Sequence, residues 1–420
     1  MAYLEYVDFQ PWREIQPAGF SNWEHDQLGL RIPELPQIFW ESGESWTEAN
    51  LWALEKLVNQ RRDIETAKGL MKHLHRYACF LEDAKLDWRH FPMRKSERAI
   101  VRFRGDLIRQ IKMGSLAAST GQARINAIVQ FYRFTAAQDL ITPTTPMWRE
   151  HSIVVPYYDS LGFKRCLQRT STDLAIPNRP VPGIRLEDGL TPLSDSHMTE
   201  LLQFTARHET RVLHLMLTIG FLIGARLQTI ATLRIENLET ARPDNYLDNF
   251  YLIRVGPGTG VSTKLDVQGD LLVPTSLYNG MKDYAYSVER LKREAKAENS
   301  NKSILFLTIR GKPYRNSTIG TLMTGLRKKS ASTGLKFMTS FKFHQTRATY
   351  GTWLMKLALS VTSPGAAIEF VKNAMLHKHE ATTFRYIKFI ETSKGKQRAA
   401  QEFNEVFTGL KNRNWDNYNA

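Results

Sequence analysis

The sequence has few cysteines and no apolar run long enough to cross a membrane. Only Cys79 and Cys166 occur in 420 residues, so neither a disulfide scaffold nor a thiolate zinc site is expected. The most apolar segment, residues 212–225, is interrupted by His214 and is too short to span a bilayer. The N-terminus lacks the basic segment and following apolar stretch of a signal peptide. These absences favour a reducing cytoplasm, with no membrane partner.

Motifs for nucleotide and metal binding are also missing. Glycines at 256, 258 and 260 resemble a nucleotide loop, but the Walker order of Gly, four residues and Gly-Lys-Ser/Thr is absent, and a strand–turn–strand hairpin explains them better. His377, His379 and Glu380 are metal-binding types, but no compatible set of further ligands accompanies them. We therefore expect no cofactor and no metal.

Positive charge is what the sequence has in excess. It contains 57 Lys and Arg against 42 Asp and Glu, a net charge of +15, and its pI is near 9.7. Such a balance suits a polyanionic partner, and nucleic acid is the commonest one. An anionic membrane surface is the alternative, but no basic amphipathic anchor or lipidation signal is present.

The chain is long enough for two domains. Most of the sequence has helical periodicity, apart from a β-rich stretch at about 250–275 and a short strand at 304–308. These patterns predict a mainly α fold with a small β-sheet or hairpin in the second domain (α+β). The expected parts are an arm or cap at 1–44, a helical domain at 45–167, a linker at 168–193, a second domain at 194–395 and a C-terminal helix or tail at 396–420.

One predicted helix, at about 96–112, is strongly basic. Three of its arginines fall on one helical face, which suits contact with phosphate groups, although charge runs on helices are more often solvated surface. The candidate DNA-binding residues are Arg94, Lys95, Arg98, Arg102 and Arg109.

The C-terminal half holds the groups that phosphodiester cleavage needs without a metal: a nucleophile, fixed cations and an acid. Arg226 follows a small Gly-Ala step after an apolar helix, where its guanidinium could grip two phosphate oxygens. His344 and Arg347 stand at i and i+3, on one helix face. Taken singly, such an arginine is more often a surface residue, and such a His-x-x-Arg pair is common by chance.

The other two positions are equally ambiguous in isolation. Lys264 lies in the predicted β-hairpin, where a flexible ammonium could reach a leaving group or could simply be solvated. His377 lies nine residues before Tyr386, with Thr382 and Thr383 between them. A lone helical tyrosine usually packs in the core, and its pKa near ~10 makes it a poor nucleophile without neighbouring cations and a base.

Their order along the chain resembles that of the tyrosine recombinase (phage integrase) family. The resemblance rests on Arg226 after small residues, Lys264 in a hairpin, the His344-x-x-Arg347 box, and His377 nine residues before Tyr386. Neighbouring segments such as RATYGTWL and ATTFRY are also similar to that family. The likeness covers about 190–395, and 45–150 is less specifically similar to the family's core-binding domain.

The resemblance implies a role for each residue. Tyr386 would attack the scissile phosphate to form a 3′-phosphotyrosyl bond and free a 5′-hydroxyl. Arg226 and Arg347 would clamp the non-bridging oxygens, and Lys264 would protonate the 5′-oxygen. His344 would assist proton transfer, and His377 would hydrogen-bond the phosphate.

Two positions depart from the family's pattern. Thr229 stands where an acidic residue is common, three positions after the first arginine, and Leu376 stands where glycine usually precedes the histidine. The first puts support for Arg226 or Lys264 in doubt, and the second puts the backbone geometry there in doubt. His379 is a competitor for the role of His377, but the nine-residue spacing favours His377.

The resemblance also implies partners. These are a double-stranded DNA recombination site held in a C-shaped clamp, a homo-tetramer on DNA from subunits that are monomers in solution, and accessory DNA-bending or directionality proteins. A C-terminal stripe of Ala399, Phe403, Val406, Phe407 and Leu410 would pack on its own domain or on a neighbouring protomer. We expect a nucleoid-associated enzyme that serves a mobile element. The alternatives are a resolvase of the same chemistry, a type IB topoisomerase, and a DNA-binding protein that has lost cleavage.

Overall fold

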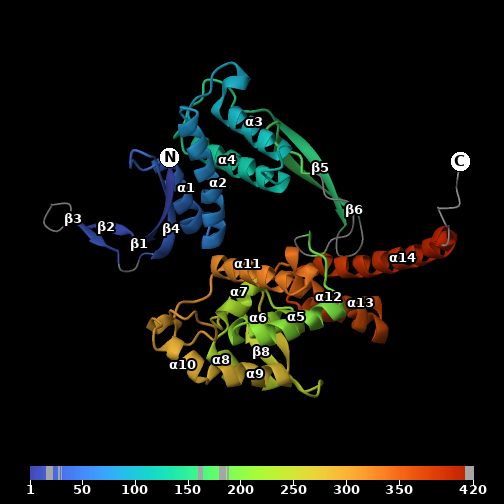
Figure 1. The fold of residues 1–420 in the computed structure, drawn as a ribbon. Helices are drawn as coiled ribbons and strands as arrows, with labels where there is room; N and C mark the ends of the chain where they lie inside the picture. The colour runs from blue at the N-terminus through green and yellow to red at the C-terminus, as the bar shows by residue number, and fades with distance from the viewer. Residues whose placement is uncertain are drawn as a thin grey trace. The chain divides into compact units, whose positions relative to one another are not determined.

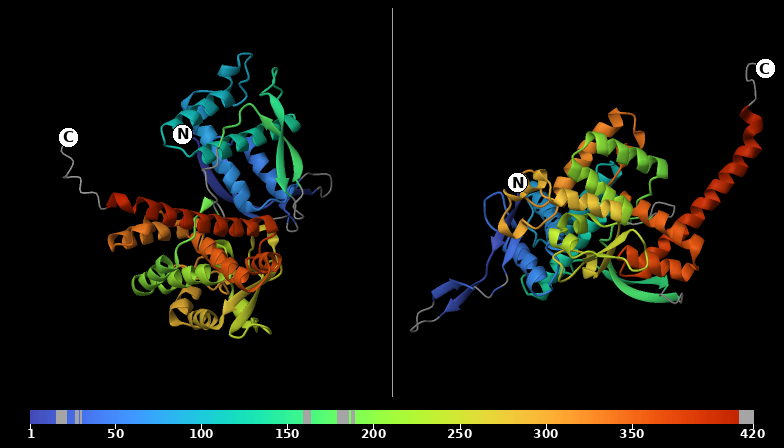
Figure 2. Two further views of the ribbon diagram at one scale, coloured as in Figure 1. Left: turned by 90° about the vertical axis from the view of Figure 1, so that its right-hand side faces the viewer. Right: turned by 90° about the horizontal axis from the view of Figure 1, so that it is seen from below.

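The chain folds into two compact units, Met1–Val181 (unit 1) and Pro182–Ala420 (unit 2). The computed structural model describes residues 1–15, 22–26, 29, 31–158, 164–178, 186 and 189–411 (Figure 1). Helices dominate both units, and the described strands form only two- and three-stranded sheets (Figure 2). The predicted mainly α fold with small sheets is therefore confirmed.

Unit 1 is built on four helices around an aromatic core. The side chains of Trp46, Trp52, Tyr77, Phe131 and Tyr132 are almost fully buried there, and the Tyr132 hydroxyl donates to the Trp88 carbonyl at 2.6 Å. The second of these helices begins after Asp63, a capping residue whose side chain accepts a hydrogen bond from the backbone N–H of Glu65. The helices are α1 (Thr47–Val58), α2 (Ile64–Asp83), α3 (Ala99–Lys112) and α4 (Ala118–Ala137).

The N-terminal segment contributes strands to this unit. β1 (Tyr3–Phe9) pairs antiparallel with β4 (Ile32–Phe39), and β2 (Trp12–Ile15) pairs with β3 (Asn22–His25). The buried side chains of Ile32, Leu35 and Ile38 in β4 join the core of the helices. Residues 1–44 therefore supply part of the unit 1 core, which the prediction of a separate arm or cap did not include. Prolines at 33 and 36 obscured the alternating pattern of a strand.

A two-stranded ribbon replaces the predicted start of the linker. β5 (Glu150–Tyr158) pairs antiparallel with β6 (Lys164–Thr172) along their whole length. The predicted helical domain at 45–167 thus includes a strand, and the predicted linker at 168–193 begins inside another strand, so both boundaries were wrong. The reason is physical: both faces of the ribbon are exposed over most of its length, so its sequence carries no alternation between a buried and a solvated face.

Arg98, predicted to contact DNA, is instead buried at the start of α3. Its guanidinium donates to the carbonyls of Pro92 at 3.0 Å and Pro146 at 2.6 Å, and its side chain also reaches the Met93 carbonyl at 3.3 Å. The arginine therefore ties two loops to the helix, and its donors face away from solvent. The expectation that it shares an exposed face with Arg102 was wrong, because the helix begins only after Arg98.

We expect Arg98→Ala to destabilise unit 1 by about 2–4 kcal/mol, because several carbonyls lose a charged donor at once. Urea unfolding followed by tryptophan fluorescence measures this, since Trp46, Trp52 and Trp88 are buried in unit 1. Arg102→Ala is the matched control on the exposed side of the same helix and should change stability by less than about 0.5 kcal/mol. Equal effects of the two variants would contradict the structural role of Arg98.

Unit 2 packs its helices around a short antiparallel sheet. Strands β7 (Arg242–Pro243), β8 (Phe250–Val255) and β9 (Gly269–Pro274) are paired in chain order. The predicted strand at 304–308 forms only isolated bridges, at Ile304 and Leu307. The helices are α5 (Asp195–His208), α6 (Arg211–Ile223), α7 (Leu227–Thr232), α8 (Ile235–Glu239), α9 (Thr275–Ala285), α10 (Val288–Glu294), α11 (Asn316–Ser332), α12 (Gln345–Val361), α13 (Pro364–Ala374) and α14 (Glu380–Lys411).

Helix α14 runs without a break across the predicted boundary at 395/396 (Figure 1). The expected C-terminal helix is thus a continuation of the helix that carries Tyr386. The predicted apolar stripe lies in this helix from Ala399 to Leu410, but the side chains of 401–411 lie outside the described part of the chain. Whether that stripe packs on its own domain or on a neighbour stays a prediction.

Candidate active site

Arg226 and Arg347 come together from segments far apart in the sequence. Helix α6 ends at Gly224, whose φ of 66° is a left-handed conformation that glycine adopts without steric cost. The chain turns there so that Arg226 lies at the start of α7 and half-buried. Residues 223–226, Thr229, Arg347 and the loop at 374–376 line one small cavity, which places both guanidinium groups in the same part of unit 2.

Arg347 is the more deeply buried of the two arginines. Its side chain is 2% exposed, and it donates to the Gly224 carbonyl at 2.5 Å and to the Met375 carbonyl at 2.7 Å. Arg226 reaches the next carbonyl, that of Leu376, at 3.4 Å. The loop between α13 and α14 is therefore held by both arginines, and it leads directly into the histidine and the helix that carries Tyr386.

Tyr386 lies fully buried beside His377. The two rings are stacked with centroids 6.1 Å apart, and Nδ1 of His377 lies 2.8 Å from the Thr383 hydroxyl, one turn before the tyrosine. The neighbouring histidine, His379, is exposed. The structure thus places His377 beside the tyrosine, and the role of His377 at the phosphate stays a prediction.

Gly351 is a site residue that the sequence did not single out. A Cβ at this position of α12 would lie 2.5 Å from Cε1 of Tyr386 and 2.6 Å from Sδ of Met375. The tyrosine ring therefore rests on the backbone of the helix that carries Arg347. A glycine inside a helix costs about 1 kcal/mol relative to alanine, and this cost was the available signal of a close approach.

His344 and Lys264 lie nearer the surface. His344 precedes α12 and is half-buried, one turn before Arg347. Lys264 is exposed in the loop between β8 and β9, directly after Thr263, which lines the arginine cavity. The loop is tightly bent, since both residues after the lysine have positive φ. Lys264 therefore lies beside the cavity on a bent loop and outside its lining.

The two departures from the family's pattern lie within this site. Leu376 has a φ of 51°, so its backbone adopts the left-handed conformation that glycine favours, at a cost of about 1–2 kcal/mol. Its side chain packs in the core of unit 2 against Gly269. Thr229 is buried and lines the arginine cavity. Leucine thus keeps the expected geometry, and Thr229 leaves the cavity without a carboxylate at that position.

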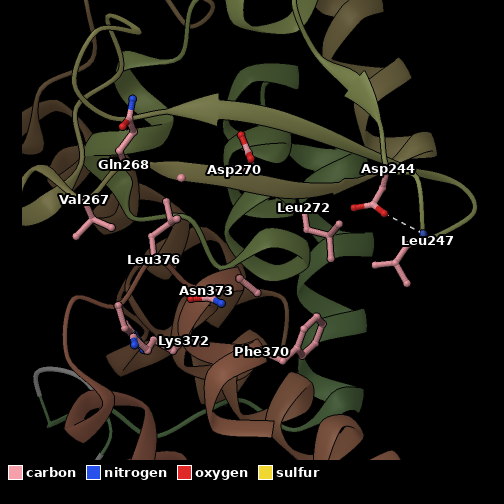
Figure 3. A pocket seen from close by; sticks show the side chains of 13 residues that line it. Asp244, Leu247, Val267, Gln268, Asp270, Leu272, Phe370, Lys372, Asn373 and Leu376 are labelled. Carbon is pink, nitrogen blue, oxygen red and sulfur yellow. Dashed lines mark hydrogen bonds between the residues drawn. The ribbon is translucent and has the colours of Figure 1, made fainter. Parts of the chain in front are cut away.

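An open pocket lies on the β-sheet side of the same loop (Figure 3). Leu376 and Ala374 line both this pocket and the arginine cavity, and His377 lines the open pocket. Two acidic residues, Asp244 and Asp270, line the open pocket, and Asp270 pairs with Arg254 at 3.3 Å and with Arg242 at 3.6 Å. The described residues include no group of three His, Cys, Asp or Glu side chains placed to hold a metal ion.

The other four candidate DNA-binding residues near α3 are exposed. Arg94 pairs with Glu97 at 3.1 Å, Lys95 pairs with Asp173, and Arg109 pairs with Asp106 at 3.5 Å. Arg102 is exposed on the same helix. Exposed ion pairs are weak, so phosphate oxygens can compete for these cations.

The fold and this arrangement define a mainly helical domain in which two arginines, a histidine and a tyrosine lie around one loop. Residues 192–393 match the model of the phage integrase family, so unit 2 contains a domain of that family. Among proteins of curated function, none matches the sequence. In the part of the chain that the structure describes, no helix is both long and apolar enough to cross a bilayer.

Several solved structures are similar to most of the chain at low identity. XerA recombinase is 16% identical with a TM-score of 0.34, covering 84% of this chain and 97% of its own. The Tn1549 transposon integrase in complex with circular intermediate DNA is 16% identical with a TM-score of 0.48, covering 81% and 94%. A lambda integrase dimer bound to a core site is 14% identical with a TM-score of 0.46, covering 80% and 93%.

Proposed function

We propose that this protein is a site-specific DNA recombinase that cleaves and rejoins DNA through a 3′-phosphotyrosyl intermediate on Tyr386. The observation that carries the proposal is the loop at 374–377. It is held by Arg347 and Arg226 on one side and leads to His377 and Tyr386 on the other. Family membership of the domain agrees with it. Integration or excision of a mobile element is the biological role that we propose.

In the proposed reaction the Tyr386 oxygen attacks the phosphorus, and the bond from phosphorus to the 5′-oxygen breaks. Arg226 and Arg347 stabilise the charge on the non-bridging oxygens, because guanidinium groups grip two oxygens at once. The bond energy is kept in the phosphotyrosine, so reversal by a 5′-hydroxyl rejoins the strand without ATP or a metal ion.

Protons move at three other side chains. Lys264 protonates the departing 5′-oxygen, and its place on an exposed, bent loop beside the cavity lets the ammonium approach bound DNA. His344 assists the loss of the phenol proton, and His377 donates a hydrogen bond to the phosphate while Thr383 orients its ring. The Tyr386 ring is buried, so α14 has to shift before the phenol reaches a phosphate.

Duplex DNA is the proposed partner, gripped by both units as a C-shaped clamp. In unit 1, the exposed Arg94, Lys95, Arg102 and Arg109 would contact phosphates, and Arg98 is excluded because its donors are used internally. We further propose that a homo-tetramer forms on DNA from monomers, with accessory DNA-bending or directionality proteins, in the nucleoid.

The proposal is tested by trapping the covalent intermediate. Duplexes of random sequence, each with a nick that lets the cleaved end diffuse away, are incubated with the protein in EDTA, and complexes that resist SDS are recovered. We expect a protein–DNA adduct whose DNA can be sequenced to identify the recombination site. If no adduct forms over the whole library, the alternative of a DNA-binding protein that has lost cleavage is favoured.

Gly351→Ala should leave the protein folded but slow adduct formation by about tenfold to a hundredfold, since displacements near 1 Å at reacting groups have effects of that size. Both Tyr386 and Met375 have to move to admit the new methyl group. Gly325→Ala, in α11 with no atom within 4 Å of the added Cβ, is the control and should only raise the melting temperature slightly. If Gly351→Ala cleaves at the wild-type rate, the ring does not need this contact.

A further inference from the structure

The ribbon of β5 and β6 is a surface that the proposed mechanism does not use. Each strand has nine residues, and the register runs from Glu150 opposite Thr172 to Tyr158 opposite Lys164 (Figure 1). Residues 151–154 and 165–170 are exposed, so both faces of the ribbon are open within unit 1. A two-stranded ribbon is only marginally stable by itself, and one with two open faces is expected to have a partner.

The two faces differ in chemistry. Alternation along the strands places Arg165, Leu167 and Arg169 on one face, together with Ile153, which is opposite Arg169. We call this set the arginine face. The other face carries Cys166, Gln168 and Thr170 of β6. The arginine face thus combines cations with apolar side chains, whereas the opposite face carries no arginine and includes Val154 and, at the base of the ribbon, Glu150.

The arginine face also exposes apolar side chains to solvent. Ile153 is 44% exposed and Leu167 is 43% exposed, although both are large apolar residues in regular strands. Arg169 forms no ion pair with any described residue. The acid at the ribbon's base, Glu150, is already bound to Arg133 at 2.7 Å, and that pairing lowers the pKa of its carboxyl group.

We propose that the arginine face binds a groove of duplex DNA, as an additional contact that rests on the proposed function. The major groove is about 12 Å wide and admits a two-stranded ribbon. Arg165 and Arg169 are four residues apart on one strand, or roughly 13 Å at about 3.3 Å per residue. That separation matches the groove width, so the two guanidinium groups reach phosphates on opposite walls while Leu167 between them contacts base edges.

The natural thiols of the chain allow a test that separates the two faces. Cys166 is exposed on the face opposite to the arginine face and Cys79 is buried, so maleimide reacts at Cys166 in the native protein. Leu167→Cys, combined with Cys166→Ser, moves the reactive thiol by one residue to the arginine face. A 40-base-pair duplex of random sequence should slow alkylation of the Leu167→Cys thiol by at least about tenfold, because bound DNA would block access of maleimide to that thiol. The same duplex should slow alkylation of native Cys166 by less than about twofold.

Salt dependence supplies a second measurement with the same duplex. Each phosphate contact contributes about 0.9 to the slope of log affinity against log salt concentration, so Arg165→Ala with Arg169→Ala should reduce the slope by about 1.8. Arg61→Ala with Arg62→Ala is the matched control, since it removes the same charge from an exposed turn of unit 1. Equal slopes for the two double variants would overturn the proposal.

Other outcomes are also decisive. Equal protection of the two thiols from alkylation would overturn the proposal. Protection that rises with protein concentration in the absence of DNA would also overturn it, because it would indicate that a second copy of the chain pairs with the ribbon. Face-specific protection without any covalent adduct would leave the ribbon contact standing and remove the proposed cleavage. A covalent adduct without face-specific protection would support the proposed cleavage and overturn the ribbon contact.

Discussion

Replacement of Tyr386 by phenylalanine is expected to abolish the covalent protein–DNA adduct. The substitution removes only the hydroxyl oxygen, so the ring keeps its contact with Gly351 and its stacking on His377. The loss should be complete on the time scale of the assay, because no other group forms the phosphotyrosyl bond. SDS-resistant complexes on the nicked duplex measure the result, with DNA affinity measured in parallel to show that binding is retained.

Tyr350→Phe is the matched control for this loss. Tyr350 is also buried, lies on α12 against Gly224, and has a pKa raised to about 12 by burial, which makes its phenol a poor nucleophile. The control should form the adduct. If Tyr386→Phe still forms it, or if Tyr350→Phe does not, the assignment of the nucleophile is wrong.

Arg347→Lys is expected to slow cleavage by about 100-fold to 1000-fold, the size of effect seen when one preorganised donor to a transition state is removed. Lysine keeps the positive charge but cannot bridge the Gly224 and Met375 carbonyls as the guanidinium does. A carbonyl left without a donor in this buried place costs about 1–3 kcal/mol, so stability falls as well. Single-turnover cleavage rates per folded molecule separate the two effects.

Arg293→Lys controls for the loss of stability. Arg293 is likewise buried in unit 2 and donates to the Leu307 carbonyl at 2.8 Å, but it lies outside the site. Its variant should unfold at lower urea concentration and cleave at the wild-type rate once folded. If Arg347→Lys loses stability and retains the wild-type rate, its role is structural only.

Much of unit 2 could be predicted from the sequence. The apolar run before Gly224, the capping serine at 194 and the glycine-rich hairpin each depend on neighbours within a few residues, so helix α6, helix α5 and the β8–β9 pair are found where local patterns indicated them. Order and spacing along the sequence selected the candidate set of Arg226, Lys264, His344, Arg347, His377 and Tyr386, although each residue is ambiguous by itself.

Other features depended on contacts between distant residues. The burial of Arg98 is decided by carbonyls at 92 and 146, and the place of Gly351 is decided by a ring 35 positions later in the chain, on another helix. Leu376 shows the same limit, because only the packed loop reveals that leucine can hold a conformation typical of glycine. No local periodicity records such contacts.

The sequence by itself indicated the class of chemistry that we propose, the candidate residues for it and most helices, since these follow from residue type, spacing and local hydrophobic period. Only the tertiary structure decided that the N-terminal strands complete the core of unit 1, that residues 150–172 contain a two-stranded ribbon, and that the arginines hold the loop before Tyr386. The physical reason is that strand pairing, burial and backbone carbonyl contacts join residues far apart in the chain, and their free energy depends on the assembled core.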